Sequence, residues 1–381
     1  MRKGWEYKKL GEVATYINGY AFKPDQWKES GTPIVRIQNL NNANAPYNYY
    51  DGEVPDKVKI QNGDLLISWS ASLGAYIWNG GNAFLNQHIF KVAFDKTDID
   101  KFFLKYAVTS KLAAMAEQVH GATMKHIVKK DFDNTQIPYP PKSTQLAIVS
   151  ELDKINELIR LKKEQLKDFD NLAQSLFYEM FGDPVENEKG WEVKKIGDLA
   201  LVKTGPFGSM LHKEDYICDG IPLVNPIHMK DYKIVPDLDF TISKEKASEL
   251  ENYLLKRNDV VFARRGDIGR CAIVSEAEQG FICGTGSLFV RFSKEIESIF
   301  IMYIIRCDSF SKHLISKAKG ATMLNINSNT IADLRIPLPP LPLQRLFAQR
   351  IEQIEPEKSE VQKSIQDLET LLASRMQYWF E

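Results

Sequence analysis

Three arginines stand close together in one short segment of the chain. Arg264, Arg265 and Arg270 lie within residues 263–270, which glycines interrupt and a hydrophobic run precedes. The pattern predicts a loop that follows a strand. Arginine can donate two parallel hydrogen bonds to guanine, and it also binds phosphate. The segment is therefore the strongest candidate for contact with DNA, against the alternative of a solvated surface turn.

Further segments carry side chains of similar chemistry. One follows a Gly-Ala-Thr-Met sequence, where lysines could bind phosphate and asparagines could bind bases or phosphates. In Asn86-Gln87-His88, Gln87 could contact adenine. The loop at residues 68–74 matches the arginine segment, and its Trp69 could stack on bases or wedge between them. The residues predicted to contact DNA are Trp69, Ser70, Gln87, His88, Lys125, His126, Lys129, Arg264, Arg265, Arg270, Lys319, Asn325 and Asn327.

These candidates have structural alternatives. The segment after Gly-Ala-Thr-Met could be a plain exposed turn, although a helix starting there would add backbone donors. Gln87 and His88 could be a buried pair that satisfies backbone groups. Trp69 could belong to the core, because an aromatic residue beside a strand usually packs there.

The sequence contains none of the motifs that would make the chain an enzyme acting on DNA. It has no Asn/Asp-Pro-Pro-Tyr/Phe motif for holding a target base, and no Pro-Asp pair is followed within about thirty residues by Asp/Glu-x-Lys for binding a catalytic metal. It also lacks a Gly-x-x-x-x-Gly-Lys-Ser/Thr phosphate loop. The histidines are scattered, and the 4 cysteines form no Cys-x-x-Cys pair. We therefore predict no catalytic residue, no metal site and reduced, mostly buried thiols.

Composition favours an ordinary globular protein. The chain has 381 residues, which suggests two domains or slightly more at roughly 150 residues per domain. Lys and Arg number 49 against 50 Asp and Glu, so a basic nucleic-acid-binding coat over the whole surface is excluded and local basic loops remain possible. No apolar stretch is long enough to span a bilayer, and the N-terminus does not resemble a secretory signal. We expect a cytoplasmic protein with no membrane partner.

The sequence contains a tandem repeat. Gly-Ala-Thr-Met occurs at residues 121–124 and again at 320–323, an offset of 320 − 121 = 199. Other blocks recur in the same order. They are Gly-Trp-Glu at 4–6 and 190–192, Asn-Gly-Asp at 62–64 against Arg-Asn-Asp at 257–259, Ile-Pro-x-Pro-Pro at 137–141 and 336–340, and Gln145 against Gln344.

Each copy begins with short β-branched and aromatic runs between turn residues, which predict strands of a mixed or antiparallel sheet. Shorter helices are predicted near 99–117 and 296–316, and proline-rich stretches then end each domain. The predicted fold class is α+β, with two globular mixed α/β domains that are each followed by a long helix. The predicted divisions are a first domain at 1–143, a long helix at 144–182, a second domain at 183–341 and a long helix at 342–381.

Apolar residues at alternating spacings of three and four predict that the two long helices pair as an antiparallel coiled coil. Roughly 35 residues give a rod about 50 Å long. Pro356 lies inside the second helix, where we expect a local bend and no break. The residues predicted to pair the helices are Leu152, Ile155, Ile159, Leu166, Phe169, Leu176, Ile351, Ile354, Val361, Ile365, Leu368 and Leu372.

This arrangement resembles the specificity subunit of type I restriction-modification systems. The resemblance rests on the duplicated Gly-Trp-Glu openings, the Gly-Ala-Thr-Met turns, the Ile-Pro-x-Pro-Pro-x-x-x-Gln ends and the helical heptads, and it covers essentially the whole chain. It implies that each globular domain is a target-recognition domain reading one half of a split double-stranded DNA sequence. The paired helices would be the spacer and the docking surface for two methyltransferase subunits.

The same resemblance implies that motor-nuclease subunits join the complex for cleavage. Catalysis and the cofactors S-adenosylmethionine, ATP and Mg would then belong to the partner subunits, with no cofactor in this chain. A duplicated protein also suits two half-sites separated by unread bases, because half-site spacing follows protein symmetry. Two alternatives remain open: the specificity chain of another restriction-modification type, and a duplicated structural adaptor that does not bind DNA.

Overall fold

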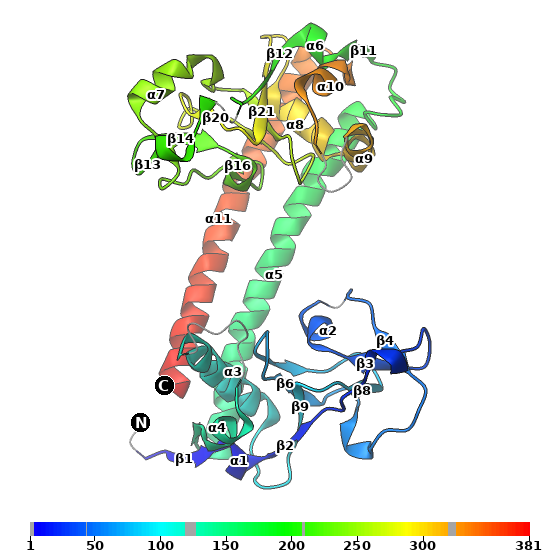
Figure 1. Cartoon of the computed structure of the whole chain (residues 1–381), viewed down its shortest axis with the longest axis vertical. Coiled ribbons are helices and arrows are strands. Elements are labelled where there is room, and N and C mark those ends of the chain that lie inside the picture. Colours follow the sequence, from blue (N-terminus) through cyan, green and yellow to red (C-terminus); the bar gives the residue numbers. More distant parts are fainter. Residues whose placement is uncertain (1–3, 43, 119–126, 208–209, 319–324) are drawn as a thin grey trace. The chain divides into compact units, whose positions relative to one another are not determined.

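The computed structural model describes residues 4–42, 44–118, 127–207, 210–318 and 325–381 (Figure 1). The chain forms two compact units. Unit 1 comprises Met1–Lys163 and Lys363–Glu381, and unit 2 comprises Glu164–Gln362. Each unit therefore contains one globular domain and parts of both long helices. The division falls inside these helices, whereas the sequence predicted boundaries at their ends.

The globular domain of unit 1 contains two four-stranded sheets and a two-stranded one. The first has the order β2-β9-β6-β7 and is antiparallel, and the second has the order β4-β3-β8-β5 with β3 and β8 parallel. Strands β1 and β10 pair at the two ends of the domain's sequence. The strands are β1 Glu6–Lys9, β2 Thr15–Asn18, β3 Thr32–Val35, β4 Asn48–Tyr50, β5 Lys59–Ile60, β6 Leu65–Ser68, β7 Gly74–Ile77, β8 Ala83–Leu85, β9 Ile89–Ala93 and β10 Gln136–Tyr139.

Helix α3 (Lys101–Gln118) covers the antiparallel sheet of unit 1 and shares a core with it. The other helices before the long one are short. They are α1 Leu10–Val13, α2 Ile37–Asn41 and α4 Lys129–Asn134, with 3-10 turns η1 Pro24–Gln26 and η2 Asp56–Val58.

Unit 2 repeats this topology. Its antiparallel sheet has the order β12-β21-β18-β19, its mixed sheet has the order β13-β17-β14-β20 with β14 and β20 parallel, and β11 pairs with β22. A hairpin of β15 and β16 is added. The strands are β11 Glu192–Lys195, β12 Ala200–Thr204, β13 Tyr216–Ile217, β14 Ile221–Val224, β15 Met229–Lys230, β16 Lys233–Ile234, β17 Thr241–Ile242, β18 Val260–Ala263, β19 Cys271–Ile273, β20 Ile282–Cys283, β21 Ser287–Phe292 and β22 Arg335–Leu338. The fold is thus the predicted pair of mixed α/β domains with an internal repeat.

The helices of unit 2 before the long one are also short. They are α6 Ile196–Leu199, α7 Lys244–Glu249, α8 Ser298–Arg306, α9 Asp308–Lys317 and α10 Ser328–Asp333, with 3-10 turns η4 Lys213–Asp215, η5 Pro226–His228 and η6 Glu251–Tyr253. The single helix predicted for 296–316 is wrong, because α8 and α9 are separated at Cys307, whose backbone is extended (φ −66°, ψ 130°). The change of direction lets Phe310 and Leu314 join the core.

A repeated turn explains one of the matched sequence blocks. In unit 1, Gly63 has φ +90° and the Asp64 carboxylate accepts a hydrogen bond from the Gln61 amide at 2.9 Å. In unit 2, Asn258 has φ +69° and Asp259 accepts one from the Lys256 amide at 2.8 Å. Glycine and asparagine tolerate the left-handed region better than other residues, so both copies can form the same turn.

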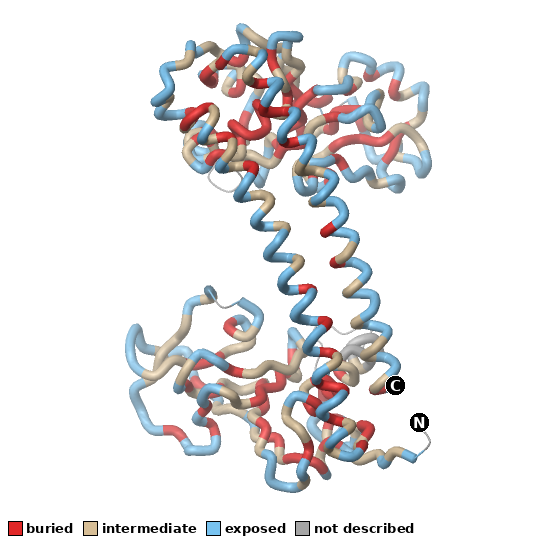
Figure 2. The backbone as a smooth tube through the Cα atoms, turned by 180° about the vertical axis from the view of Figure 1, so that it is seen from behind, coloured by how far each residue is buried: buried red, intermediate tan, exposed pale blue. Residues whose placement is uncertain are grey.

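Each long helix contributes its last turns to a core of hydrophobic residues (Figure 2). Helix α5 (Lys142–Phe181) follows the first domain, yet its Phe177 and Phe181 lie in the core of unit 2. Helix α11 (Leu341–Phe380) follows the second domain, and its Phe380 lies in the core of unit 1. Helix α11 is continuous through Pro356. The two copies therefore exchange the ends of their long helices.

Candidate nucleic-acid interface

Three segments of the second copy come together in unit 2: the arginine loop, the segment after Gly-Ala-Thr-Met, and residues 284–286, which match Asn86–His88 of the first copy. The Arg264 amide donates to the Gly286 carbonyl at 3.1 Å, and the Ile326 amide donates to the Arg264 carbonyl at 2.9 Å. Arg265 also forms a β-bridge with Asn325. Segment 284–286 and the segment after Gly-Ala-Thr-Met therefore flank the start of the arginine loop. We call the three segments together the unit 2 loop cluster.

The first copy contains the equivalent arrangement, the unit 1 loop cluster. The Trp69 amide donates to the His88 carbonyl at 3.3 Å, and the Ile127 amide donates to the Trp69 carbonyl at 3.1 Å. Ile127 and Ile326 are separated by the repeat offset, 326 − 127 = 199. Position 69 thus occupies the same place in the backbone as position 264. The scaffold is repeated, while tryptophan replaces arginine at its centre.

The arginines of the unit 2 loop cluster differ in accessibility. Arg265 is exposed, whereas Arg264 and Arg270 are half-buried. Arg270 donates through Nε to Asp267 Oδ2 at 2.9 Å and through Nη1 to the Pro226 carbonyl at 3.1 Å. Gly266 and Gly269 have φ of +74° and +103°, so the tight loop uses conformations that favour glycine.

Arg264 is half-buried, and part of its guanidinium lies inside the protein. Its Nε atom and the Asn325 side-chain oxygen are both buried without a hydrogen-bond partner among the residues that the structure describes. Burial, with a smaller contribution from Arg265, holds the pKa of the Arg264 guanidinium below its ordinary value. Arginine titrates so far above neutral pH that the group stays charged.

In the unit 1 loop cluster, Trp69 stacks on Phe90 with ring centroids 5.5 Å apart and meets His88 edge-on at 5.0 Å. Its indole nitrogen donates to Asn18 Oδ1 at 3.3 Å. Gln87 and His88 are half-buried, and His88 has φ +72°. Ser70 is buried. Trp69 is therefore partly core and partly accessible, while Ser70 lies below the surface.

The residues near the Gly-Ala-Thr-Met sequences are only partly described. Lys125, His126 and Lys319 lie outside the described residues. Lys129 is exposed and forms an ion pair with Asp133 at 2.9 Å. Asn327 caps α10 by accepting a hydrogen bond from the Thr330 amide at 2.8 Å, which gives it a structural role.

Two further contacts involve asparagines that were not singled out from the sequence. In unit 1, the phenol of Tyr76 on β7 donates to Asn41 Oδ1 of α2 at 2.7 Å. In unit 2, Asn225 Oδ1 accepts from the Gly286 amide at 3.2 Å and so holds η5 against the cluster. The asparagine-rich sequence around Asn41 could have indicated the first of these asparagines, since amide side chains are the usual partners of adenine.

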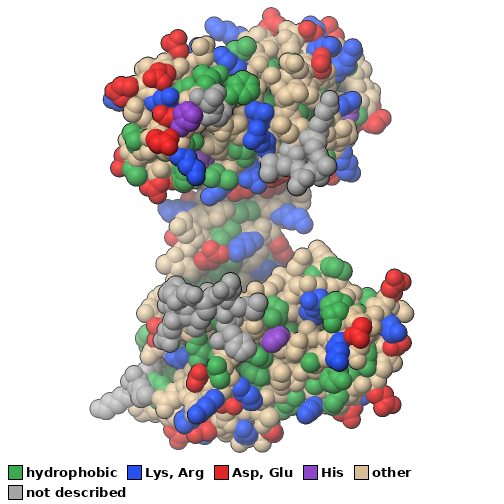
Figure 3. All heavy atoms as spheres, in the orientation of Figure 1, with side chains coloured by type: hydrophobic (Ala, Val, Ile, Leu, Met, Phe, Trp, Pro, Cys, Tyr) green, Lys and Arg blue, Asp and Glu red, His purple; other side chains and the backbone are tan. Residues whose placement is uncertain are grey.

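A hollow of about 670 Å³ lies beside the arginine loop of unit 2. Asp267, Gly269 and Arg270 line one side of it, and Tyr232 and Arg306 line another. The Arg306 guanidinium lies 4.2 Å from the ring centre of Tyr232 and 4.6 Å from that of Tyr303. On the face shown in Figure 3, the Lys and Arg side chains of the described residues are interspersed with acidic ones and form no continuous basic patch.

No group of three or more His, Cys, Asp or Glu side chains that could hold a metal ion occurs in the described part of the chain. Cys271, Cys283 and Cys307 are buried thiols, and burial raises the pKa of Cys271 to about 12 and that of Cys307 to about 11. Among the described helices, none is long and apolar enough to cross a membrane.

The family of type I restriction-modification DNA specificity domains matches this sequence twice, over residues 2–168 and over residues 188–370. The chain belongs to this family. The two matches coincide with the two copies of the repeat, so each loop cluster lies in its own specificity domain.

Curated relatives of this specificity chain span nearly its whole length. It is 22% identical over 389 residues to the EcoBI specificity subunit of Escherichia coli, which covers 95% of this chain and 81% of that protein. It is 23% identical over 402 residues to the MjaVIII specificity subunit of Methanocaldococcus jannaschii, with 97% and 92% covered.

Solved structures show the same fold. The S subunit from M. genitalium has a TM-score of 0.55 at 14% identity, covering 100% of this chain and 98% of that one. A chain from a structure of type I complex assembly and conformational transition has a TM-score of 0.60 at 17% identity, covering 99% and 97%.

The long helices of the specificity chain run antiparallel within each unit. In unit 1, Arg375 Nη2 donates to Glu151 at 3.1 Å and Lys163 pairs with Glu369 at 2.7 Å. In unit 2, Lys358 pairs with Asp170 at 2.9 Å. Lys358 and Arg375, which interrupt the apolar spacing of the second long helix, thus have partners on the facing helix. The predicted pairing positions are buried at Leu152, Ile155, Ile159, Ile351, Val361 and Ile365 and half-buried at Leu166, Phe169, Leu176, Ile354, Leu368 and Leu372.

Proposed function

We propose that this chain reads a split double-stranded DNA target for a type I restriction-modification complex, one half-site with each loop cluster. The observation that carries the proposal is the repeated scaffold with different side chains at its centre. Hydrogen bonds at positions 69 and 264 hold the same three segments together in both copies. Two readers built alike but carrying tryptophan and arginine would select different half-sites.

The central residues suit different kinds of contact. Arg265 is exposed and Arg264 is half-buried beside it, so the guanidinium of each could donate to guanine or phosphate. Trp69 offers an aromatic surface that could stack on or wedge between bases. Gln87 and Asn41 add amides of the type that pairs with adenine.

In this proposal the chain recognises the DNA sequence, and partner subunits catalyse methylation and cleavage. This part of the proposal is supported by the lack of catalytic motifs in the sequence and by the specificity-subunit names of the relatives. Two methyltransferase subunits would dock on the paired helices, and motor-nuclease subunits would join them. S-adenosylmethionine, ATP and Mg would be bound by those partners. Residues 1–143 and 183–341 would be the recognition domains, with 144–182 and 342–381 as spacer and docking helices.

Mapping of methylated positions tests the proposal. DNA from cells with and without this chain is sequenced for methylation, in the presence of the partner subunits in both cases. The expected result is one split sequence, two short half-sites around unread bases, methylated only when the chain is present. If the assembled complex shows no preference for any split sequence, the chain is an adaptor and the proposal fails.

A further inference from the structure

A buried glutamine lies at the start of each long helix. Gln145 in α5 is 1% exposed, and Gln344 in α11 is fully buried at 0%. The Gln145 amide nitrogen donates to the Pro140 carbonyl at 2.9 Å, and its oxygen accepts from the Asp100 amide at 2.8 Å. Each glutamine therefore uses both ends of its amide inside its own unit.

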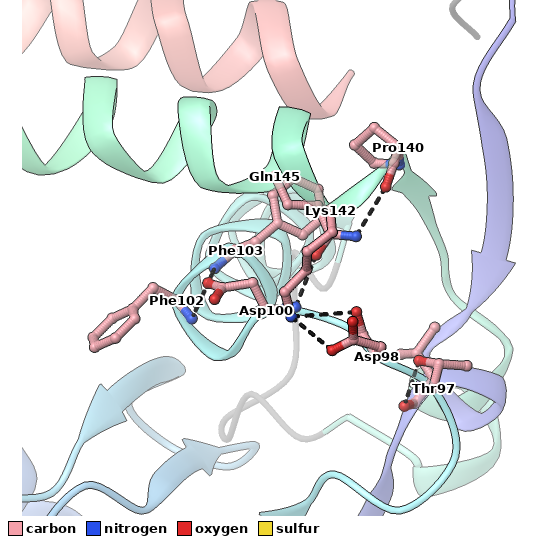
Figure 4. Close-up of polar contacts among 9 residues, drawn as sticks. Thr97, Asp98, Asp100, Phe102, Phe103, Pro140, Lys142 and Gln145 are labelled. Carbon is pink, nitrogen blue, oxygen red and sulfur yellow. Dashed lines mark hydrogen bonds and ion pairs between the residues drawn. The ribbon is translucent and has the colours of Figure 1, made fainter.

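The second copy repeats both hydrogen bonds. Gln344 donates to the Pro339 carbonyl at 2.8 Å and accepts from the Glu297 amide at 3.1 Å. Pro140 and Pro339 follow the last strand of each domain, and Asp100 and Glu297 precede helices α3 and α8. One side chain thus ties together the end of a strand, the start of a domain helix and the start of a long helix, as Figure 4 shows for Gln145.

The ion pairs around the two glutamines are not the same. In unit 1, Lys142 pairs with Asp98 at 2.9 Å, and the Asp98 side chain is 86% exposed. In unit 2, Arg345 pairs with Glu297 at 3.1 Å. The Arg345 and Glu297 side chains are 57% and 30% exposed. Ion pairs that water reaches constrain little, because water competes for the charges. The glutamine bonds are the constraint that the two joints share, and a buried amide that loses a partner is costly.

We propose that Gln145 and Gln344 are positioning residues that fix the direction in which each long helix leaves its recognition domain, and through it the number of unread bases between the half-sites. Apolar packing is non-directional, whereas two hydrogen bonds at opposite ends of a planar amide define an orientation. Helix α5 has 40 residues. Such a helix is about 60 Å long, so a rotation of about 5° at its start displaces its far end by about 5 Å, more than one base-pair step.

This inference rests on the proposed function. It predicts that replacing either glutamine changes the number of unread bases between the half-sites and leaves the half-site sequences unchanged. The test uses the complete chain assembled with its methyltransferase subunits. A DNA library with the two half-sites and a randomised spacer length is methylated and sequenced. The variants are Gln145→Met, Gln344→Met and the double variant. Methionine keeps the length of the side chain and removes the amide.

The control is Asn39→Leu. Asn39 is also a buried amide that bridges backbone groups, with the Arg36 amide as donor at 3.0 Å and the Ala45 carbonyl as acceptor at 3.2 Å. It lies within a recognition domain, away from the joint with the long helix. Its replacement should lower the melting temperature or alter half-site reading and leave the spacer length unchanged.

The wild-type complex should methylate one spacer length. Each methionine variant should raise methylation of neighbouring lengths by about tenfold, equivalent to about 1.4 kcal/mol, and the double variant should raise it further. Gln145→Glu and Gln344→Glu keep the acceptor and remove the donor, so they give the same test if methionine prevents folding.

An unchanged spacer preference in folded variants would overturn the inference. Failure of all these variants to fold would also overturn it, because the amides would then serve stability alone. If the wild-type complex methylates no split sequence, the result contradicts the proposed function instead, so the two failures are distinguishable.

Discussion

At the scale of single residues, the two loop clusters share one backbone arrangement and differ in their side chains. Positions 69 and 264 make equivalent backbone hydrogen bonds, so the side chain can change without a change in the chain path. The other two arginines of this loop differ in their contacts and exposure. Arg270 is tied to Asp267 and Pro226, whereas Arg265 is exposed. Arg265 is therefore the arginine that can be removed with the smallest effect on the fold.

Arg265→Ala should relax recognition at one position of the half-site read by unit 2. A bidentate contact to guanine discriminates by about 1–3 kcal/mol, and an exposed side chain changes stability by no more than about 0.5 kcal/mol. Methylation of a library of half-site variants measures the first effect, and thermal unfolding measures the second. Arg257→Ala, another exposed arginine of unit 2, serves as the control. Unaltered sequence preference in Arg265→Ala would remove this residue from the interface.

Asp170 links the long helices to the core of unit 2. It accepts hydrogen bonds from Lys358 at 2.9 Å and from Arg306 at 3.1 Å. Burial alone would raise its pKa, but the hydrogen bond and charge of Lys358, helped by Arg306, hold the pKa of the carboxyl below its ordinary value. A carboxylate whose pKa is lower in the folded state stabilises that state above its unfolded pKa of about 3.9, and the contribution is lost as the pH falls through the folded pKa.

Asp170→Asn should therefore lower the free energy of unfolding at neutral pH. The difference from the wild type should shrink as the pH falls below about 4, because the wild-type carboxylate is then protonated as well. Urea unfolding at several pH values measures it. Asp168→Asn, which changes an exposed residue of the same helix, should alter the free energy of unfolding at neutral pH by no more than about 0.5 kcal/mol. A difference that stays constant down to low pH would contradict the assignment.

At the scale of elements, the exchange of helix ends joins the two copies. Phe181 packs against Phe300 with ring centroids 4.8 Å apart in unit 2, and Phe380 packs against Phe103 at 5.4 Å in unit 1. The two phenylalanines are separated by the repeat offset, 380 − 181 = 199. Each globular core is therefore completed by the helix that follows the other domain.

Phe181→Ala should destabilise unit 2, and Phe380→Ala should destabilise unit 1, each by about 3–5 kcal/mol because a large buried ring is lost. Hydrogen exchange resolved along the chain separates the two effects. Leu172→Ala and Leu371→Ala alter exposed residues of the same helices and should cost little. Faster exchange in the β2-β9-β6-β7 sheet of unit 1 after Phe181→Ala would contradict the reciprocal arrangement.

At the scale of the whole molecule, both long helices continue from one compact unit into the other. The charged pairs described above join residues on the two facing helices. An insertion in one helix therefore needs a matching insertion in the other to keep these pairs in register. The length of the two helices is then the feature of the chain that could set the distance between the two readers.

Insertion of one heptad after Ile159, with a matching heptad after Leu371, should lengthen the unread gap. Seven helical residues add about 10 Å, which corresponds to about three base pairs. The measurement is the spacer length in the methylated sites, and the half-site sequences should remain as they were. An unchanged gap in a folded, active complex would show that the helices do not set the spacing.

The sequence by itself determined the duplication, the two sets of strands and the paired long helices. These features are visible because they are local: a strand or a heptad has a period that appears along the chain, and a repeat has an offset. The reliance on local patterns also explains the wrong helix prediction. The sequence treated 296–316 as one helix, since its apolar residues continue through Cys307, and the break depends on where Phe310 and Leu314 find the core.

Only the tertiary structure decided which side chains share a site and which are accessible. Trp69, His88 and Ile127 are far apart in sequence and meet through backbone hydrogen bonds between separate segments. The same holds for the division of the arginines into exposed and half-buried, and for the packing of Phe181 and Phe380 in the core of the other copy. Burial and long-range pairing depend on every element that packs around a residue, so residue type and spacing along the chain do not specify them.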